Sequence, residues 1–227
     1  MKLLGLIGGM SAESTTPYYQ LLNQRVRERL GGLHSARLLL SSLDFAPIAR
    51  MQAEERWDEA GQVLADAARV LEAAGAEAVL ICTNTMHVCA EAVQAAVSVP
   101  LIHIADATAA VLSAAGVRRP LLLGTRFTME KPFYRQRLAG AGIQASVPDP
   151  EARALLHAII YDELCVGVVS PASKAVVLQM IASADEADGV IFGCTEIGLL
   201  VDPAELELPA VDSLRAHVEA AVDFALG

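Results

Sequence analysis

Residues 77–87 read Glu-Ala-Val-Leu-Ile-Cys-Thr-Asn-Thr-Met-His, and residues 187–198 follow the same pattern with Ala-Asp-Gly-Val-Ile-Phe-Gly-Cys-Thr-Glu-Ile-Gly. In both stretches a short apolar run, typical of a buried strand, ends abruptly in polar side chains. Those side chains therefore follow the carboxyl ends of two strands, which is the edge where open α/β sheets bind ligands. Two such edges, each with a thiol or a hydroxyl group, predict a site assembled from two halves that face one substrate.

The repeat extends well beyond these two stretches. Each half of the chain opens with an apolar run and a glycine turn, then has a Pro-aromatic-Tyr triplet, and ends with a helical interval and another short strand. The corresponding segments are residues 3–10 and 120–125, Pro17-Tyr18-Tyr19 and Pro132-Phe133-Tyr134, and residues 99–104 and 208–211. Recurrence of these elements in the same order indicates gene duplication and predicts two pseudo-symmetric domains.

Predicted strands and helices alternate along the chain, which is typical of βα units and mostly parallel sheets. The predicted strands are residues 3–7, 37–42, 78–82, 101–104, 120–124, 189–193 and 209–211. The predicted helices are residues 17–30, 54–74, 88–97, 106–115, 131–140, 151–166, 171–184 and 213–225, the first of them opened by Pro17. The expected fold class is α/β, with two pseudo-symmetric α/β domains and the active site between them.

The domain boundary is predicted near Ala105, where the first half of the repeat ends. The last predicted strand, residues 209–211, resembles the strand at 101–104, and a terminal helix that crosses back would tie the two halves together. We therefore expect a discontinuous first domain, residues 1–105 plus 209–227, and a second domain, residues 106–208. Domains of about 100 residues each are of ordinary size.

Composition argues against several classes of function. The 227 residues carry a formal net charge of −10, which argues against nucleic-acid binding because that function needs a concentrated basic surface. No uncharged apolar run reaches the roughly 18 residues of a membrane span, and no basic leader precedes the first strand. We therefore expect a cytoplasmic protein whose partner is a small molecule, with neither a nucleic acid nor a membrane as partner.

The cysteines lie at positions 82, 89, 165 and 194, and their spacing matches no common metal site. We therefore predict no metal, and no disulfide in a reducing cytoplasm. Cys89 and Cys165 fall in helical, apolar segments and are predicted to be packing residues.

Cys194 differs from the other cysteines because it follows Gly193 at a predicted helix start. The positive end of the helix and nearby backbone N–H groups are expected to favour its thiolate and lower its pKa. Thr195 would donate to it, and Glu196 would accept or relay a proton. The alternative is a buried cysteine that packs at a strand end.

The equivalent position in the first half is chemically different. Thr83 corresponds to Cys194, and Cys82 falls one place earlier, so its side chain should point to the opposite face of the strand. A threonine hydroxyl is a far weaker acid than a thiol and needs an activating partner. Asn84 and Thr85 offer donors suited to a carboxylate, although Thr85 is equally consistent with a helix cap.

Turns after other strands bring further groups toward the predicted site. Gly8-Gly9-Met10-Ser11 and Gly124-Thr125 lie where the backbone can approach a ligand closely, but the first run lacks the third glycine of a dinucleotide fingerprint. Gln52 follows the second strand on a segment that could close over a ligand. His87 is expected to be a satisfied histidine at a helix start, and His103 a structural residue in an apolar strand.

Taken together, these motifs resemble those of the aspartate/glutamate racemase family. The resemblance covers essentially the whole chain, through Gly8-Gly9-Met10, Asn84-Thr85-Met86-His87 and Gly193-Cys194-Thr195-Glu196-Ile197. It implies two pseudo-symmetric α/β domains, a homodimer, no cofactor, and racemisation by two groups on opposite faces of the substrate Cα. In the family both groups are usually cysteines. Here Thr83 takes one place, which resembles the bacterial L-aspartate/glutamate-specific subgroup.

The resemblance also implies roles for individual residues. Cys194 and Thr83 would exchange the Cα proton on the two faces. Glu196, in place of the histidine that follows Cys-Thr in glutamate racemases, points to the aspartate-type branch. The positions predicted to hold the amino acid substrate are Met10, Gln52, Thr83, Asn84, Thr85, Thr125, Thr195 and Glu196.

Two alternatives stay open at this point. A reaction that needs one thiol only, decarboxylation of a malonate-like acid or isomerisation of a dicarboxylate, would suit a site with Thr83 better than symmetric racemisation does. A non-catalytic protein that binds acidic amino acids is the second alternative, although Gly193-Cys194-Thr195-Glu196 is intact. The substrate range, which includes aspartate, glutamate and other amino acids, is also open.

Overall fold

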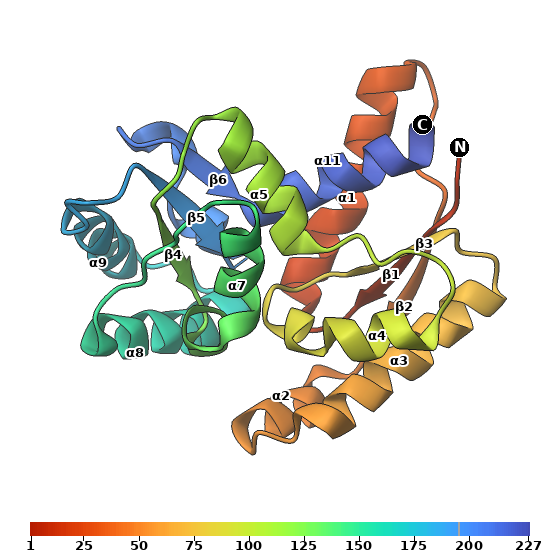
Figure 1. The fold of residues 1–227 in the computed structure, drawn as a ribbon, viewed down its shortest axis with the longest axis horizontal. Helices are drawn as coiled ribbons and strands as arrows, with labels where there is room; N and C mark the ends of the chain where they lie inside the picture. Colours follow the sequence, from red (N-terminus) through yellow and green to blue (C-terminus); the bar gives the residue numbers. More distant parts are fainter. Residues whose placement is uncertain (195) are drawn as a thin grey trace. The chain divides into compact units, whose positions relative to one another are not determined.

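The computed structural model describes residues 1–194 and 196–227 and divides into two compact units (Figure 1). Unit 1 comprises Met1–His103 and His217–Gly227, and unit 2 comprises Ile104–Ala216. The chain passes from unit 1 to unit 2 after His103 and returns within its last helix. No helix in the described ranges is long and apolar enough to cross a membrane.

Unit 1 is built on a parallel sheet with the strand order β2-β1-β3. The strands are β1 (Leu4–Gly8), β2 (Leu38–Ser42) and β3 (Ala78–Ile81). Every residue of β1 and β3 is buried, as expected for parallel strands covered on both faces. Leu101 extends the sheet through an isolated bridge to Val79.

The helices of unit 1 are α1 (Ala12–Leu30), α2 (Phe45–Ala53), α3 (Trp57–Ala73), the 3-10 helix η1 (Thr85–Cys89), α4 (Ala90–Ala96) and most of α11 (Ser213–Leu226). One face of α3 is rich in alanine and leucine and packs in the same apolar core as Ile7, Val79 and Ile81. Small alanine side chains let the helix approach the sheet closely.

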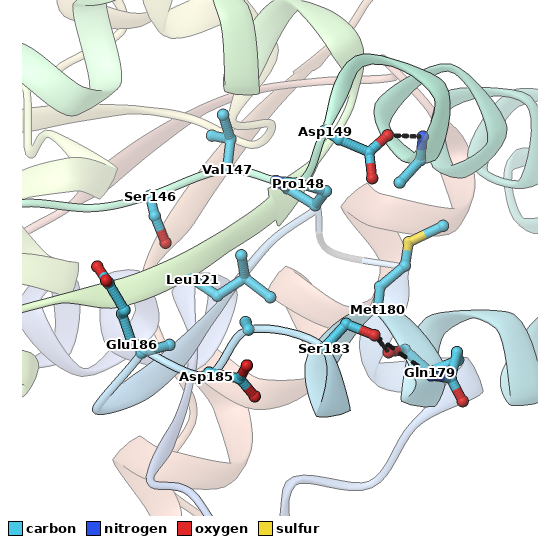
Figure 2. Close-up of a pocket in the computed structure, with 13 residues that line it drawn as sticks. Leu121, Ser146, Val147, Pro148, Asp149, Gln179, Met180, Ser183, Asp185 and Glu186 are labelled. Atoms are coloured by element: carbon cyan, nitrogen blue, oxygen red, sulfur yellow. Dashed lines mark hydrogen bonds between the residues drawn. The ribbon is translucent and has the colours of Figure 1, made fainter.

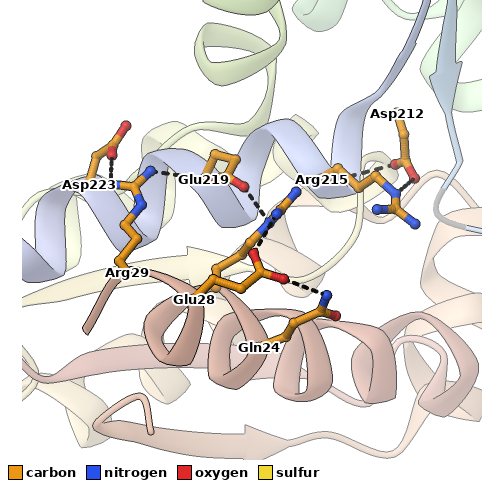
Figure 3. A network of polar contacts seen from close by, with 8 residues as sticks. Gln24, Glu28, Arg29, Asp212, Arg215, Glu219 and Asp223 are labelled. Atoms are coloured by element: carbon orange, nitrogen blue, oxygen red, sulfur yellow. Dashed lines mark hydrogen bonds and ion pairs between the residues drawn. The ribbon is translucent and has the colours of Figure 1, made fainter. Parts of the chain in front are cut away.

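Contacts between α1 and α11 hold the C-terminal helix in unit 1 (Figure 3). On the exposed side, Arg25 Nε lies 2.5 Å from Glu219 Oε1, and Arg29 pairs with both Glu219 and Asp223. In the interior, the Tyr18 hydroxyl lies 2.8 Å from His217 Nδ1. Solvent screens the exposed pairs, so the buried contact is the stronger constraint on the position of α11.

Unit 2 repeats the plan with a parallel sheet of order β4-β5-β6. The strands are β4 (Pro120–Gly124), β5 (Gly189–Gly193) and β6 (Ala210–Asp212). Its helical segments are α5 (Ile104–Ala114), α6 (Arg126–Glu130), α7 (Pro132–Gly140), α8 (Pro150–Ala158), η2 (Ile159–Glu163), η3 (Leu164–Val166), α9 (Pro171–Ala182), α10 (Ile197–Leu200) and η4 (Pro203–Glu205).

The α/β class with parallel sheets in two similar domains is confirmed. The position of the last strand is a correction. The repeat in the sequence predicts that residues 209–227 belong to the first domain, but β6 pairs with β5 in unit 2, and the return to unit 1 comes at His217. Residues 101–104 resemble residues 209–211 because each segment lies beside the polar-ended strand of its own unit: Leu101 bridges Val79 of β3, and β6 pairs with β5. Duplication therefore places 209–211 in the second unit.

Two helix boundaries also differ from the predicted ones. Helix α1 begins at Ala12, not at Pro17, because the Ser11 hydroxyl accepts from the Ser14 N–H and caps it. The predicted helix at 54–74 is interrupted at its start by a turn in which Glu55 has a positive φ of 56°. A separate helix, α2, precedes that turn.

Candidate functional site

The polar residues of unit 1 gather at one edge of its sheet. Cys82 directly follows β3, and its N–H donates to the Ile7 carbonyl at 2.9 Å, which aligns the end of β3 with the end of β1. Met10 lies just beyond β1 on the same edge. Gly9 is needed in between, because its φ is 83° and an added Cβ would lie 2.2 Å from the Leu43 carbonyl oxygen.

Cys82 and Thr83 have different surroundings. Cys82 is 1% exposed, and burial raises the pKa of its thiol well above the ordinary value. Thr83 is partly exposed. The thiol in this half therefore stays neutral inside the core, and the threonine hydroxyl is the more accessible group.

The backbone around Thr83 is held by neighbouring side chains. The Ser14 hydroxyl donates to the Cys82 carbonyl at 3.1 Å, and His87 Nδ1 donates to the Thr83 carbonyl at 2.8 Å. Asn84 and Thr85 are buried, and Thr85 is the first residue of η1, not the residue that caps it. The structure thus brings Thr83, Asn84 and Thr85 together at the end of β3.

Two further predicted substrate contacts in unit 1 are buried. Gln52 lies in α2, and its Nε2 is 3.0 Å from the Met86 sulfur. A thioether is a weak acceptor, so this amide can exchange the contact for a stronger one. Met10 belongs to the apolar core together with Ile7 and Ile81.

Three histidine rings lie close together, and one of them, His87, contacts the Thr83 carbonyl. The centroid of His87 is 4.5 Å from that of His103 and 5.7 Å from that of His217. His217 Nε2 donates to the Ile102 carbonyl at 2.7 Å, so Nδ1 accepts from the Tyr18 hydroxyl. Burial lowers the pKa of His217 to about 4. The expectation of a strand around His103 was wrong, because only Leu101 bridges the sheet there.

In unit 2 the central feature is the contact between Cys194 and Glu196. The Cys194 thiol donates to Glu196 Oε2 at 3.0 Å, and both side chains are buried. Burial, followed by the negative charge of Glu196, raises the pKa of Cys194 well above its ordinary value. The predicted lowering of this pKa was therefore wrong, because the carboxylate and the burial outweigh any effect of the four-residue helix α10. Thr195, a predicted substrate contact, lies outside the described residues.

Thr125 follows the neighbouring strand of the same sheet. Its hydroxyl caps α6, accepting from the Thr128 N–H at 3.3 Å. Gly124 and Gly193 are paired in register, and a Cβ on Gly124 would lie 2.8 Å from the Gly193 carbonyl oxygen. These glycines let the ends of β4 and β5 approach closely, which places Thr125 beside the strand that leads to Cys194.

Cys165 and Tyr161 lie near the Cys194–Glu196 pair, a proximity that the sequence does not predict. Cys165 packs against the core of unit 2, as predicted, and its sulfur also lies 3.7 Å from Glu196 Oε1. Tyr161 belongs to the same group: burial, followed by the charges of Cys165, Cys194 and Glu196, raises the pKa of its phenol. No local pattern signals these positions, because they reach Cys194 only through the tertiary fold.

A separate cavity of about 620 Å³ lies on unit 2 along the edge of β4 (Figure 2). Leu121, Val147 and Met180 form its apolar lining, and Asp149, Asp185 and Glu186 contribute carboxylates. Asp149 already caps α8 through two backbone N–H groups at 2.9 Å. None of the predicted site residues lines this cavity.

Residues 7–221 of the chain match the sequence model of the Asp/Glu/hydantoin racemase family. The chain belongs to this family. It is similar to a protein from Yersinia pestis assigned to the Asp/Glu racemases, with 48% identity, a TM-score of 0.93 and complete coverage of both chains. An aspartate racemase homologue from Pyrococcus horikoshii shares 33% identity, with a TM-score of 0.87 and complete coverage of both.

A broad-specificity amino-acid racemase of Bacillus subtilis shares 24% identity over 219 residues, which cover 93% of this chain and 92% of the relative. The resemblance noted in the sequence is thus confirmed as family membership, and the enzyme class is isomerase. Among the described residues, no three His, Cys, Asp or Glu side chains are grouped to hold a metal ion.

Proposed function

We propose that this racemase-family enzyme interconverts the L and D forms of aspartate and glutamate, without a cofactor, by exchanging the Cα proton. The observation that carries the proposal is the 3.0 Å contact between the Cys194 thiol and Glu196 Oε2 at the carboxyl end of β5. A buried thiol and carboxylate in direct contact form a pair that can give and take one proton. Acidic substrates are supported by the named relatives, which include an aspartate racemase homologue.

Cys194 serves one face of Cα. Its raised pKa keeps the resting thiol neutral, which is the form that protonates a carbanion. For the reverse step the thiol first gives its proton to Glu196 Oε2. The thiolate then takes the Cα proton, and the electron pair of the broken C–H bond is delocalised into the substrate carboxylate. Glu196 is therefore the group that makes abstraction by a high-pKa thiol feasible.

Thr83 serves the opposite face. Its hydroxyl protonates the carbanion and recovers its proton through Asn84 or water. Because the threonine alkoxide is scarcely populated, abstraction by Thr83 is slower than abstraction by Cys194. The two directions consequently differ in kcat, and their KM values differ by the same factor, because an equilibrium constant of unity between enantiomers requires equal kcat/KM in both directions.

The remaining residues of the proposed site bind the substrate. Asn84 and Thr85 hold the substrate carboxylate, and Glu196 with its neighbour Thr195 contacts the substrate next to Cys194. Gln52 exchanges its contact with the Met86 sulfur for the substrate, while Met10 and Thr125 line the approach from the adjacent strands. A homodimeric assembly and a cytoplasmic location are also proposed, on the resemblance alone.

The test is incubation of the purified enzyme with L-aspartate, D-aspartate, L-glutamate and D-glutamate, each separately in D₂O. NMR follows deuterium at Cα, and chiral chromatography follows the enantiomers. We expect exchange with inversion in wild type, loss of both in Cys194→Ala, and equal amounts of D and L forms at long times. Absence of exchange with all four substrates would overturn the proposal.

A one-thiol decarboxylation is the second candidate, and it is favoured by the burial of Cys82, which leaves Thr83 as the accessible group in the first half. Incubation with a malonate-like acid distinguishes the two. Release of CO₂ that depends on Cys194, without racemisation of any amino acid, would replace the racemase proposal.

A further inference from the structure

Glu196 accepts from two thiols, one on each carboxylate oxygen. Cys194 reaches Oε2 at 3.0 Å, and the Cys165 sulfur lies 3.7 Å from Oε1. The side chain of Glu196 is only 4% exposed, so its orientation is set by neighbouring groups of the protein and not by bulk water. The oxygen that faces Cys194 therefore depends on what holds the other oxygen.

The local backbone explains how Cys165 comes to face Glu196. Helix α8 continues into the π-helical turn η2, then into the 3-10 turn η3, and ends at Gly167, whose φ is 77°. A π turn contains an extra residue relative to an α-helix, so it changes the direction in which the following side chains point. Leu164 enters the core of unit 2, and Cys165 lies beside it on the border of that core, partly buried.

The segment is anchored on its other side. The Ser173 hydroxyl of α9 donates to Glu163 Oε2 at 2.6 Å, and the Val168 N–H donates to the Glu163 carbonyl at 2.9 Å. These contacts hold the chain two residues before Cys165 and three residues after it. Its thiol is thus presented to Glu196 from a defined position.

We propose that Cys165 is a positioning residue for the proposed racemisation: it holds Oε1 of Glu196 so that Oε2 faces the Cys194 thiol. The assignment deepens the proposed function and rests on it. Cys165 acts on the reaction mainly through Glu196, and it exchanges no proton with the substrate. Its removal should let the carboxylate rotate away, which deprives Cys194 of both its proton acceptor and the adjacent negative charge.

The other titratable groups near this pair are Tyr161, His157, Arg126 and Asp212. Burial raises the pKa of Tyr161 and lowers that of His157, whose ring lies 4.5 Å from Tyr161, so both stay neutral at moderately alkaline pH. The positive charge of Arg126 acts on both of them. Asp212 lies near Gly198 and accepts from the Leu214 N–H at 2.9 Å. Substitution of Cys165 removes one of the charges that raise the pKa of Tyr161, and Cys165 is not among the causes of the His157 shift.

The experiment measures the rate of Cys194 alkylation by iodoacetamide against pH, with each cysteine peptide resolved by mass spectrometry. The main comparison is between Cys165→Val, which fills the space without a donor, and Cys165→Ser, which keeps a donor. We expect the midpoint of the pH dependence of Cys194 alkylation to fall by about 0.5 to 1 pH unit in Cys165→Val, because the negative charge of Glu196 has moved away from the thiol. Cys165→Ser should keep a midpoint close to that of wild type.

A double mutant separates positioning from packing. Glu196→Gln should lower the Cys194 midpoint by itself, and adding Cys165→Val to it should cause no further shift, because Cys165 acts through Glu196. Racemisation should fall in Cys165→Val while alkylation of Cys194 becomes easier. Alkylation needs no substrate, so this result stands even if the enzyme proves not to racemise aspartate or glutamate.

Two outcomes would overturn the assignment. One is an unchanged Cys194 midpoint in Cys165→Val, and the other is a full additional shift in the Glu196→Gln background. If Cys165→Val does not fold, Cys165→Ala is measured with the same criteria, and circular dichroism checks that each variant is folded.

Discussion

The Cys194 thiol lies 3.0 Å from Glu196 Oε2 at the carboxyl end of β5, and both side chains are buried. Their proximity means that the negative charge of Glu196 opposes ionisation of the thiol while its oxygen offers the nearest acceptor for the thiol proton. Glu196 therefore has two opposite effects on Cys194, which can be separated by experiment.

Replacement of Glu196 by Gln should separate them. The amide removes the charge, so the pKa of Cys194 falls toward its ordinary value. The amide also takes up no proton, so racemisation should fall by about 100-fold or more, the usual contribution of a general base. Initial rates by chiral chromatography measure the second effect, and Glu196→Asp is the control that retains a carboxylate. Full activity in Glu196→Gln would show that Glu196 is not the proton acceptor.

The buried histidine of α11 predicts a loss of stability in acid. His217 has a pKa of about 4 in the folded state, below its ordinary value of 6.5, because burial disfavours the imidazolium. The stabilisation of the folded state by the neutral His217 is therefore complete above pH 6.5 and is lost as the pH falls toward 4. Between pH 7 and 4.5 the free energy of unfolding should fall by about 2 to 3 kcal/mol from this group.

Urea denaturation at the two pH values measures this change. His217→Gln is the control, since its amide can replace the two hydrogen bonds but does not titrate. The variant should show a shallower loss of stability in acid than wild type. An identical loss in both proteins would mean that other groups cause the acid sensitivity.

Burial of Cys89 in unit 1 predicts a loss of stability at high pH. Burial raises the pKa of Cys89 from 9.0 to about 11, so the folded state favours the neutral thiol. The stabilisation of the folded state by the neutral Cys89 thiol is complete below pH 9 and is lost as the pH rises toward 11. At pH 10.5 the loss should be about 2 kcal/mol. Denaturation at pH 8 and 10.5 tests this, with Cys89→Ala expected to have the smaller difference between the two values.

Much of the fold follows from local patterns, and the site follows from them only in part. The buried runs of β1, β3, β4 and β5 are apolar and end in polar or glycine-rich turns, so they could be located from the sequence. The pKa of Cys194 could not be inferred from the helix start alone, because its direction depends on how deeply the thiol is buried.

Cys165 and His217 show a second limit of sequence analysis. Each lies in a helical segment whose local pattern indicates only packing. Their partners, Glu196 for Cys165 and Tyr18 for His217, come from distant parts of the chain. Tertiary contacts of this kind become visible only when the helices are placed on the sheets.

The unequal halves of the proposed site lead to a prediction for Thr83. Replacement by Cys supplies a group that ionises far more readily than a hydroxyl, and the position is partly exposed, unlike the neighbouring Cys82. For a racemase, kcat of the slower direction should rise by about tenfold, with KM of that direction rising in step so that kcat/KM stays equal in the two directions. Thr83→Ser is the matched control, because it keeps a weakly acidic hydroxyl and should leave the asymmetry in place. Initial rates at saturating L-aspartate and saturating D-aspartate give the ratio of the two kcat values. A Thr83→Cys enzyme as asymmetric as wild type would show that Thr83 does not serve the second face of Cα.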